Sequence, residues 1–511
     1  MSKEQGDYGR TWLLLSFPES SSFLAACGAR LDLIFCPSKR HWVPTPKPPS
    51  EASRLSPPAG DELLSVVERH GGRLRALSLS RAAVLAALFV LAWRQALRVV
   101  LPGFDATGTP HHYLGQKISV GEVLAVIAFV SFVLARLPMR FRLGRGPLVT
   151  FAAAALALAG LAGASSFWAL YPGLAVVQGA HLVIWVAFAL TVAGARVPPH
   201  RMAATFVLGL LVQATVGFAQ VVVQNHVGLS ALGELKIPPD DPLKYVTAGS
   251  SLFLRAYGLS PHPNVLAGHL AVGLILCWGL VAGRRPVGRG LVAVTWTVLF
   301  TALLLTFSRS GLLGAVLGMT MAAIWLRRAG VLGRRPTAGL GYKLAVTAAV
   351  MIAVFAYSFS RYLPGRIPSM DALRGSDIRF VLINEAIKLI TNHPLVGVGA
   401  GNFSVATRAT TSDQTAYDAV HNIPLLIQAE LGVVGLAAVA VMVAVLVAVG
   451  YRRWRDRSPD LWYGLIAGSL MALVTVSLFD HYLWTRPEGG LMGAWLVGWW
   501  LADELKDASP G

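Results

Sequence analysis

Long apolar runs separated by short polar connections make up the chain from residue 82 onward. Each run approaches the roughly 20 apolar residues that a helix needs to cross the hydrocarbon core of a bilayer. The pattern therefore predicts an all-α, polytopic membrane protein with about 12 transmembrane helices. The predicted spans are 82–102, 118–137, 147–168, 175–195, 204–224, 264–283, 290–307, 311–327, 343–359, 422–450, 461–479 and 488–503.

The apolar pattern also predicts how the chain is divided. Residues 1–80 hold a Pro/Ser-rich stretch and few apolar runs, which is typical of a cytoplasmic tail without regular structure. Residues 81–503 form the membrane domain, and residues 504–511 form a second cytoplasmic tail. One large loop outside the cytoplasm, residues 360–421, lies within the membrane domain.

Basic clusters predict the orientation of the spans, because they occur on every second connection. The loops rich in Lys and Arg should face the cytoplasm, together with both termini. These clusters lie at 140–146, 195–201, 283–290, 327–336 and 451–457. The remaining connections should face outward, including two long inserts at 225–263 and 360–421.

Composition agrees with a membrane protein. Only 14% of residues are charged, against roughly 25% in soluble domains. The formal net charge of +18 comes from the short basic clusters between apolar runs, so we expect no nucleic-acid partner. The three cysteines, Cys27, Cys36 and Cys277, lack metal-ligand spacing, and we expect neither a disulfide framework nor a metal site from them.

The large outer insert contains an amphipathic segment from residue 377 to 391. Phe380, Ile383 and Ile387 recur at helical spacing, and Arg379 lies in the first turn. A helix of this kind lies in the headgroup layer, where it meets a lipid-borne substrate, or packs on the outer end of the bundle. The sequence is compatible with both placements.

Two arginines lie at predicted outer ends of spans. Arg255 precedes a Gly/Pro-rich turn, after which Asn264 is a candidate N-cap of the next span. Arg309 lies in Ser308-Arg309-Ser310-Gly311, which joins two spans with almost no loop. An outward Arg in a tight hairpin is typical of an anion clamp, because a guanidinium group binds phosphate oxygens in a bidentate way. The alternative for both is a snorkelling anchor at the headgroups.

A second group of polar residues surrounds the start of the span at 422–450. His421 and Asn422 stand at its beginning, and Glu430 lies inside the membrane, where it needs a partner. Gly397, Gly399 and Gly401 precede them and suit a sharp turn against neighbouring backbone better than a nucleotide loop. A lone interfacial histidine is the simplest interpretation of His421. Further along, Asp480 could orient a histidine or hold an arginine. The alternative is an aromatic-belt corner, with Trp484 as an interfacial aromatic.

Together these motifs resemble the O-antigen ligase family, over about residues 200–500. The resemblance rests on order and spacing rather than on any single motif. It uses Arg255 through Asn264, SRSG at 308–311, Arg379, HPLVGVGAGNF at 393–403, and His421-Asn422 with Glu430 and Gly432. It implies an all-helical bundle with one large periplasmic loop, in the bacterial inner membrane, with the active site facing the periplasm. The first 80 residues have no counterpart in the family pattern.

The resemblance implies glycosyl transfer without a metal or other cofactor, from an undecaprenyl-diphosphate-linked glycan to an acceptor hydroxyl. The implied catalytic residues are His421 as general base, with Arg309 and Arg255 on the pyrophosphate. The candidate substrate-binding residues are Arg379, Asn264, Ser308, Asn422 and Asp480.

Other functions remain open from the sequence. The acceptor could be a glycolipid resembling lipid A-core, a second glycan as in a polymerase, or a protein as in an O-oligosaccharyltransferase. A transporter or flippase for lipid-linked glycans is a more distant alternative. It is disfavoured because residues 82–283 and 290–503 show no internal repeat and the ionisable residues cluster at the outer face.

Overall fold

The structure is a computed structural model that describes residues 60–98, 117–136, 146–237, 245–248, 251–282, 288–331, 335–363, 378–410, 418–457 and 460–502. Residues 63–511 form one compact unit, which holds every element below except the first residues of α1. The predicted tails at 1–59 and 504–511 lie outside the described residues.

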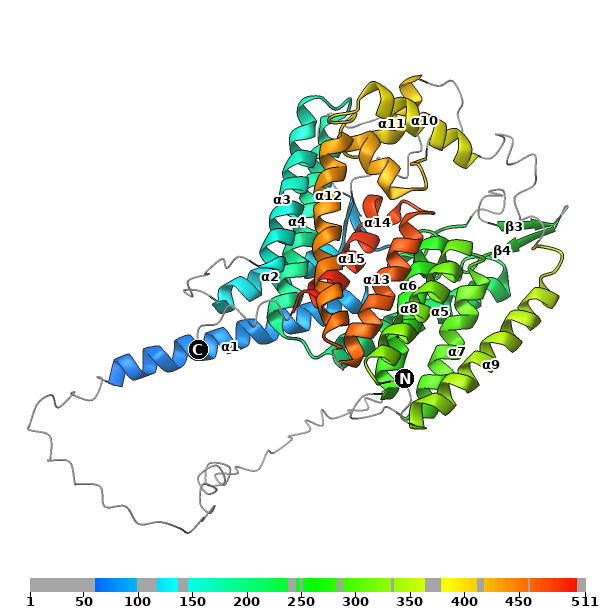
Figure 1. Ribbon diagram of the computed structural model, residues 1–511, viewed down its shortest axis with the longest axis horizontal. Coiled ribbons are helices and arrows are strands. Elements are labelled where there is room, and N and C mark those ends of the chain that lie inside the picture. Colours follow the sequence, from blue (N-terminus) through cyan, green and yellow to red (C-terminus); the bar gives the residue numbers. More distant parts are fainter. Residues whose placement is uncertain are drawn as a thin grey trace, which may run out of the picture. The chain divides into compact units, whose positions relative to one another are not determined.

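The described chain is mostly helical, as predicted (Figure 1). The helices are α1 (Gly60–Phe89), α2 (Val120–Arg136), α3 (Pro147–Ala164), α4 (Pro172–Ala195), α5 (Pro199–Val223), α6 (Pro263–Ala282), α7 (Arg289–Leu305), α8 (Arg309–Arg328), α9 (Arg335–Ser358), α10 (Ile378–Asn392), α11 (Phe403–Thr410), α12 (Ile423–Arg455), α13 (Leu461–Ser477), α14 (Tyr482–Thr485) and α15 (Pro487–Trp500). Two antiparallel strand pairs join β1 (Ala96–Arg98) to β2 (Lys117–Ser119) and β3 (Tyr245–Ala248) to β4 (Ser251–Leu254).

Within the described residues, 7 helices are long and apolar enough to cross a membrane, and two shorter apolar helices accompany them. The 7 are Pro147–Phe167, Pro172–Ala195, Pro199–Val223, Pro263–Val281, Arg309–Arg328, Gly341–Ser358 and Ile423–Arg455. The shorter pair is Arg289–Leu305 and Leu461–Ser477. The chain is therefore a multi-pass membrane protein, and a total of about 12 crossings stays a prediction.

The start of the membrane domain differs from the prediction. Helix α1 begins at Gly60, so residues 60–80, which the sequence assigned to an irregular tail, are helical. The same helix ends at Phe89 and is followed by β1, so the predicted span 82–102 is not one continuous helix. Apolar residues at Leu63, Val66 and Val67 already follow helical spacing, and the charged residues before and after them concealed this pattern.

Small residues let the central helices approach closely. Helices α8 and α13 meet at Gly318 and Gly468, where an added Cβ would lie 2.6 and 2.4 Å from the partner's backbone oxygen. Such contacts are typical of helix pairs in membranes, where packing drives association. Helix α6 also packs on α8 and α13, and 89% of its spanning window is buried. A site built on the start of α6 therefore stands on a rigid support.

The two ends of the bundle carry different residues. Helices α6, α8 and α12 begin at the end where α7 and α13 finish, because the chain reverses at each connection. The opposite end holds basic side chains packed on aromatic rings. The guanidinium of Arg328 lies 4.8 Å from the Trp454 ring centre, and that of Arg453 lies 4.0 Å from the Tyr463 ring centre. This end corresponds to the basic connections predicted to face the cytoplasm.

The outer insert packs on the bundle through its glycine-rich turn. Helix α12 is broken at Gly432, whose φ of 64° and ψ of −165° are accessible essentially only to glycine. The turn after α10 fills the break: Val398 and Gly399 donate to the carbonyls of Ala429 and Glu430, at 3.0 and 2.8 Å. A Cβ on Gly397 would lie 2.3 Å from the backbone of Glu430. The predicted sharp turn against neighbouring backbone is confirmed.

Helix α10 confirms the predicted amphipathic helix in the outer insert. It packs on α12, and in Figure 1 both α10 and α11 (yellow) lie at the end of α12. The buried face consists of Leu382, Glu385, Ala386 and Leu389. Phe380 and Ile387 of the predicted apolar stripe are 37% and 51% exposed. The helix therefore packs on the bundle's end and still presents apolar side chains outward.

Candidate active site

Arg255, Asn264 and Asp480 form one hydrogen-bonded chain at the end of the bundle where α6 begins. The Nη2 of Arg255 donates to Asn264 Oδ1 at 2.9 Å, and Asn264 Nδ2 donates to Asp480 Oδ2 at 2.8 Å. All three side chains are buried. Arg255 follows β4, and its Nε donates to the Thr306 carbonyl at 2.8 Å. The snorkelling alternative for Arg255 is wrong, because this residue is 4% exposed and its guanidinium lies inside a polar network.

Asn264 was predicted to cap α6, and the structure gives that role to another residue. Helix α6 begins at Pro263, and the Asn264 amide nitrogen donates to Nδ1 of His262 at 3.2 Å. The imidazole of His262 therefore does the capping, and the Asn264 side chain is left to connect Arg255 with Asp480. Burial, with Arg255 beside it, lowers the pKa of His262 to about 3, so this ring is neutral at neutral pH.

Arg309 is the first residue of α8, in the tight turn that the sequence predicted. Ser308 caps this helix, since its Oγ accepts from the Gly311 amide at 3.3 Å. Phe307 adopts a left-handed φ of 51°, which reverses the chain within a few residues of α7. Thr306, the acceptor for Arg255, lies three positions before Arg309. The turn thus connects both predicted arginines, and the Arg309 side chain is exposed.

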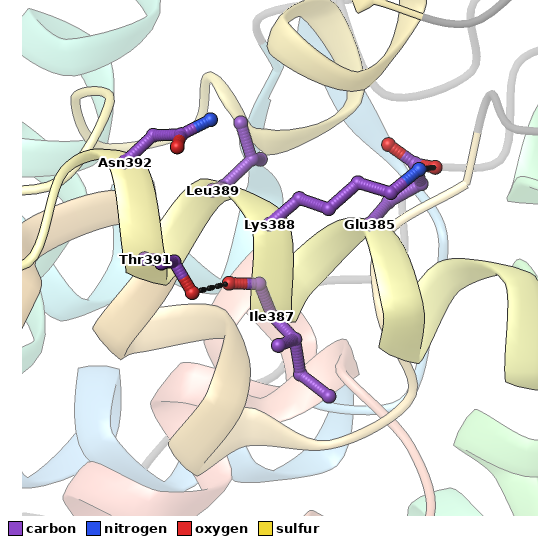
Figure 2. A pocket seen from close by; sticks show the side chains of 6 residues that line it. All are labelled: Glu385, Ile387, Lys388, Leu389, Thr391 and Asn392. Carbon is purple, nitrogen blue, oxygen red and sulfur yellow. Dashed lines mark hydrogen bonds and ion pairs between the residues drawn. The ribbon is translucent and has the colours of Figure 1, made fainter.

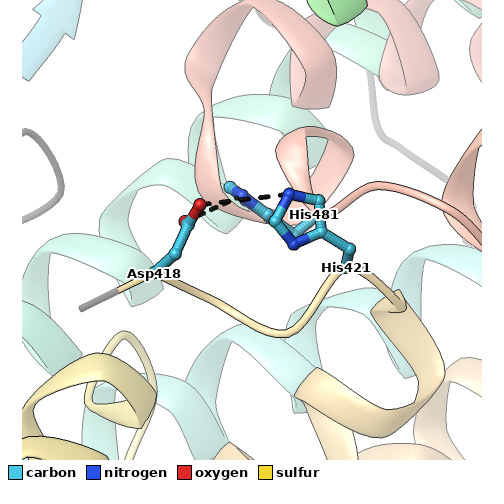
Figure 3. Close-up of side chains that lie close together, drawn as sticks. All are labelled: Asp418, His421 and His481. Carbon is cyan, nitrogen blue, oxygen red and sulfur yellow. Dashed lines mark ion pairs between the residues drawn. The ribbon is translucent and has the colours of Figure 1, made fainter. Parts of the chain in front are cut away.

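Asp418 bridges two histidines at the start of α12 (Figure 3). Its Oδ2 lies 3.9 Å from Nε2 of His421, and its Oδ1 lies 3.3 Å from Nε2 of His481. The two imidazole rings meet edge to face, with centres 5.0 Å apart. The His481 amide nitrogen donates to Asp480 Oδ1 at 2.8 Å, which joins this cluster to the Arg255 network.

The two histidines differ in their electrostatic surroundings. Burial, followed by the nearby His481, lowers the pKa of His421 below its ordinary value. Burial alone would do the same to His481, but the hydrogen bond and charge of Asp418 outweigh it and raise the pKa of His481. Burial also disfavours the charged form of Asp480, yet the neighbouring histidines lower its pKa overall. His421 is therefore the neutral imidazole of the pair.

Asn422 and Arg379 also reach this region. Asn422 caps α12 by accepting from Leu425, and its Nδ2 donates to the Leu478 carbonyl at 3.2 Å, which ties α12 to the end of α13. Arg379, in the first turn of α10, lies close enough to His421 to lower the pKa of that histidine. The structure thus brings residues from several separate segments to one end of the bundle.

Glu430 has the partners that its depth in the membrane requires. Its carboxylate accepts from the Trp484 indole at 2.8 Å and from the Phe403 amide at 3.4 Å. Trp484 is buried, although its position in the sequence suggested an interfacial aromatic. The expectation that Glu430 pairs inside the bundle is confirmed. Its hydrogen bonds to Trp484 and Phe403 stabilise the part of α12 that follows His421.

A separate cavity of about 330 Å³ lies along α10 (Figure 2). It is lined by Glu385, Ile387, Lys388, Leu389, Thr391 and Asn392. Lys388 Nζ pairs with Glu385 Oε1 at 2.7 Å along one side. The sequence-predicted site residues do not line this cavity, so it is not the candidate active site.

Asp418, His481 and His262 belong to the site but were not among the residues proposed from the sequence. His481 directly follows Asp480, and His262 lies two positions before Asn264. The site joins residues that are distant in the sequence: Asn264 and Asp480, which share a hydrogen bond, are 216 positions apart. The available signal was histidine next to other polar residues in an otherwise apolar chain.

Apolar helices of spanning length, with arginine, amide, carboxylate and imidazole groups gathered at one end, define a multi-pass membrane protein with a polar candidate site. Residues 292–440 match the family model described as O-antigen ligase. Over that segment the match confirms the resemblance found in the sequence. The comparison with curated proteins finds no match.

The matched segment is narrower than the resemblance drawn from the motifs. It runs from α7 into α12 and contains Ser308, Arg309, Arg379, His421 and Asn422. Arg255, Asn264 and Asp480 lie outside it, but the hydrogen bonds from Arg255 to Thr306 and from Asn422 to Leu478 connect them to it.

Proposed function

We propose that this protein transfers a glycan from an undecaprenyl-diphosphate donor to an acceptor hydroxyl, by the O-antigen ligase type of reaction, without a metal. The observation that carries the proposal is the continuous polar network from Thr306 through Arg255, Asn264 and Asp480 to the two histidines. It gathers the charges needed to hold a diphosphate next to an imidazole that can accept a proton.

The arginines hold the leaving group. When the acceptor oxygen bonds to the anomeric carbon, the bond from that carbon to the diphosphate oxygen breaks and the diphosphate takes the electron pair. Arg255 donates to the Thr306 carbonyl and Arg309 begins α8 three positions later, so both can offer guanidinium donors to this charge. Helices α6 and α8 both begin here, so the positive ends of their dipoles add to the same field.

His421 accepts the proton of the acceptor hydroxyl. Its lowered pKa keeps the imidazole neutral at neutral pH, as a general base requires. Its side chain is 18% exposed, so it reaches the surface of the cluster, whereas His481 is 6% exposed. Asp418 and Asp480 lie nearby and stabilise the imidazolium that forms. Arg379, Asn264, Ser308, Asn422 and Asp480 position the substrates around this centre.

The site is proposed to face the periplasm of the bacterial inner membrane, with both termini in the cytoplasm. The basic and aromatic end of the bundle, at Arg328 and Arg453, supports this orientation, because positive residues favour the cytoplasmic side. The exposed apolar side chains of α10 support a position at the headgroups, where a polyprenyl-linked donor lies. A reporter fused near residue 400 and active only outside the cytoplasm tests the orientation; loss of its signal would overturn it.

The direct test is transfer in vitro from a purified lipid-linked glycan. The purified protein in detergent should move the glycan to an acceptor, and a chelator should not reduce the rate. Candidate acceptors separate the ligase from its alternatives: a glycolipid resembling lipid A-core for a ligase, a second glycan for a polymerase, a protein for an oligosaccharyltransferase. Transfer to none of them, with movement of the lipid-linked glycan across a vesicle membrane instead, would favour a flippase.

A further inference from the structure

Asp418, His421 and His481 form a cluster of metal-ligand type at the mouth of the candidate active site. One ligand atom from each residue lies within 4.8 Å of the other two (Figure 3). The three come from the start of α12 and from the segment between α13 and α14. Two histidines and one carboxylate are a common ligand set for catalytic zinc, which leaves a fourth position open.

Thr485 contacts His481 at two atoms: its hydroxyl lies 2.7 Å from Nδ1 and 3.2 Å from the His481 carbonyl oxygen. When the hydroxyl donates to the carbonyl, its Oγ1 accepts from Nδ1, and Nε2 is left with a lone pair. The Nε2 lone pair then points at Asp418 Oδ1, which also carries lone pairs. Two acceptors facing each other need a positive charge between them, either a proton or a metal ion.

The distances also accommodate a metal ion in place of that proton. A charge-assisted N–H···O bond spans about 2.7–2.9 Å. The observed separations of 3.3 and 3.9 Å between Asp418 and the two Nε2 atoms are longer than that. Bonds of about 2.0–2.2 Å to a tetrahedral zinc place neighbouring ligand atoms roughly 3.3–3.6 Å apart, close to both values.

The surroundings also resemble those of a metal site. The partner of His481 Nδ1 is the Thr485 hydroxyl, the kind of outer contact that orients a metal-bound imidazole. Asp480 accepts from the His481 amide and from Asn264, so it is not a ligand but adds a second negative charge. Arg379 and Arg486 lie near His421 and His481 and partly oppose a dication. Asp418 is 33% exposed, so the cluster is open to solvent.

We propose that Asp418, His421 and His481 bind a zinc(II) ion, and that the bound ion inhibits glycan transfer. Binding does not depend on the proposed function. Inhibition does, because the zinc would occupy the Nε2 lone pair of His421 that the general base needs. The ion is therefore a regulator of this site and not a cofactor of the reaction.

Binding is tested on the full chain in detergent, purified with an affinity tag that contains no histidine. Titration with Co²⁺ should give the visible absorption of a tetrahedral complex at a single ion per chain, and added Zn²⁺ should remove it. His421→Ala, His481→Ala and Asp418→Asn should each weaken binding at least about tenfold. His393→Ala, at an exposed histidine in the turn after α10, is the matched control and should bind like the wild type.

A gentler variant covers the case in which loss of a ligand unfolds the protein. Thr485→Val leaves all three ligands in place and removes only the acceptor of the His481 Nδ1 proton, so binding should weaken about 10–100-fold. The proposal is overturned if the wild type gives no tetrahedral absorption, or if the histidine variants bind Co²⁺ like the wild type.

Inhibition is measured separately, as transfer with Zn²⁺ and after its removal by a chelator. Added Zn²⁺ should lower the rate, and the chelator should restore it. Bound zinc that leaves the rate unchanged would show that His421 Nε2 is not the base, while the metal site would stand. Glycan transfer by a wild-type protein that binds no metal would overturn the metal site and leave the proposed function standing.

Discussion

Arg255 and Asp480 bind the two ends of one side-chain amide, that of Asn264, at 2.9 and 2.8 Å. The amide accepts from the guanidinium and donates to the carboxylate, so opposite charges are linked without a direct ion pair. This arrangement holds Asp480 beside the histidines, where it also accepts from the His481 amide nitrogen.

Replacing Asn264 with Leu should remove both bonds while keeping a similar volume. Hydrogen bonds to charged groups contribute about 1.5–3 kcal/mol each, so transfer should fall by about 10–100-fold and the melting temperature should drop. Transfer in vitro and thermal unfolding in detergent measure the two effects. Asn392→Leu, at an exposed position at the end of α10, is the control. Wild-type transfer by the Asn264 variant would mean that the bridge does not position Arg255.

Replacing His421 with Ala should leave membrane insertion and folding intact and abolish most of the transfer. General-base assistance contributes about 10²–10⁴-fold, so the rate should fall within that range. His393→Ala changes an exposed histidine and should retain the wild-type rate. A His421 variant that transfers glycan at the wild-type rate would remove the base from the mechanism.

Replacing Arg309 with Lys keeps the charge at the start of α8 and loses the guanidinium fork. The rate should fall about tenfold or more if two phosphate oxygens are bound at once, since an ammonium group cannot reproduce bidentate geometry. Arg361→Lys, at another exposed arginine, should have no effect. Full activity of the Arg309 variant would reduce its contribution to simple charge attraction.

Replacing Gly432 with Ala should destabilise the outer insert. The backbone at this position is strained for any other residue, and the new Cβ would lie 2.1 Å from the Leu395 carbonyl oxygen. The free energy of unfolding should fall by at least about 2 kcal/mol, seen as a lower melting temperature in detergent. Gly493→Ala is the matched change in α15, where nothing lies within 4 Å of the added Cβ. Equal melting temperatures for both variants would contradict the tight packing at the break.

The buried His262 predicts a dependence of stability on pH. Its pKa is about 3 in the folded protein against an ordinary 6.5, so the unfolded chain binds a proton between these values and the folded chain does not. Stability is therefore lost as the pH falls below about 6.5, by up to about 1.4 kcal/mol per pH unit. His262→Asn keeps a capping acceptor and removes the titration. Its melting temperature should fall less than that of the wild type between pH 7 and pH 5, and identical slopes would exclude His262 as the cause.

The fold was predictable wherever the length of an apolar run is enough to identify a spanning helix. The spans at α3 to α6 coincide with runs of suitable length, and α10 was found from its spacing and its end at Asn392. The helical start at Gly60 escaped notice because charged residues interrupt its apolar positions. The strands are only three or four residues long, too short to leave a periodic signal.

The site was predictable in part. Arg255, Asn264 and Asp480, all proposed as site residues, lie together. The sequence assigned the cap of α6 to Asn264 because histidine is not a usual capping residue, but in the structure His262 has that role. Asp418 and His481 approach each other only through the packing of α12 against the end of α13. The sequence marks His481 as a polar residue next to Asp480, but no local pattern encodes its contact with Asp418, which depends on the fold.

The break in α12 also bears on the order of biosynthesis. Pro394 and Leu395 accept hydrogen bonds from Val433 and Val434, so the turn and the helix satisfy each other's backbone groups. Neither the turn nor the broken helix has these hydrogen-bond partners until both have emerged on the same face of the bilayer. His421 lies in the part of the chain between this turn and the break in α12. It therefore reaches its place in the site only after the ribosome has made the helix that follows it.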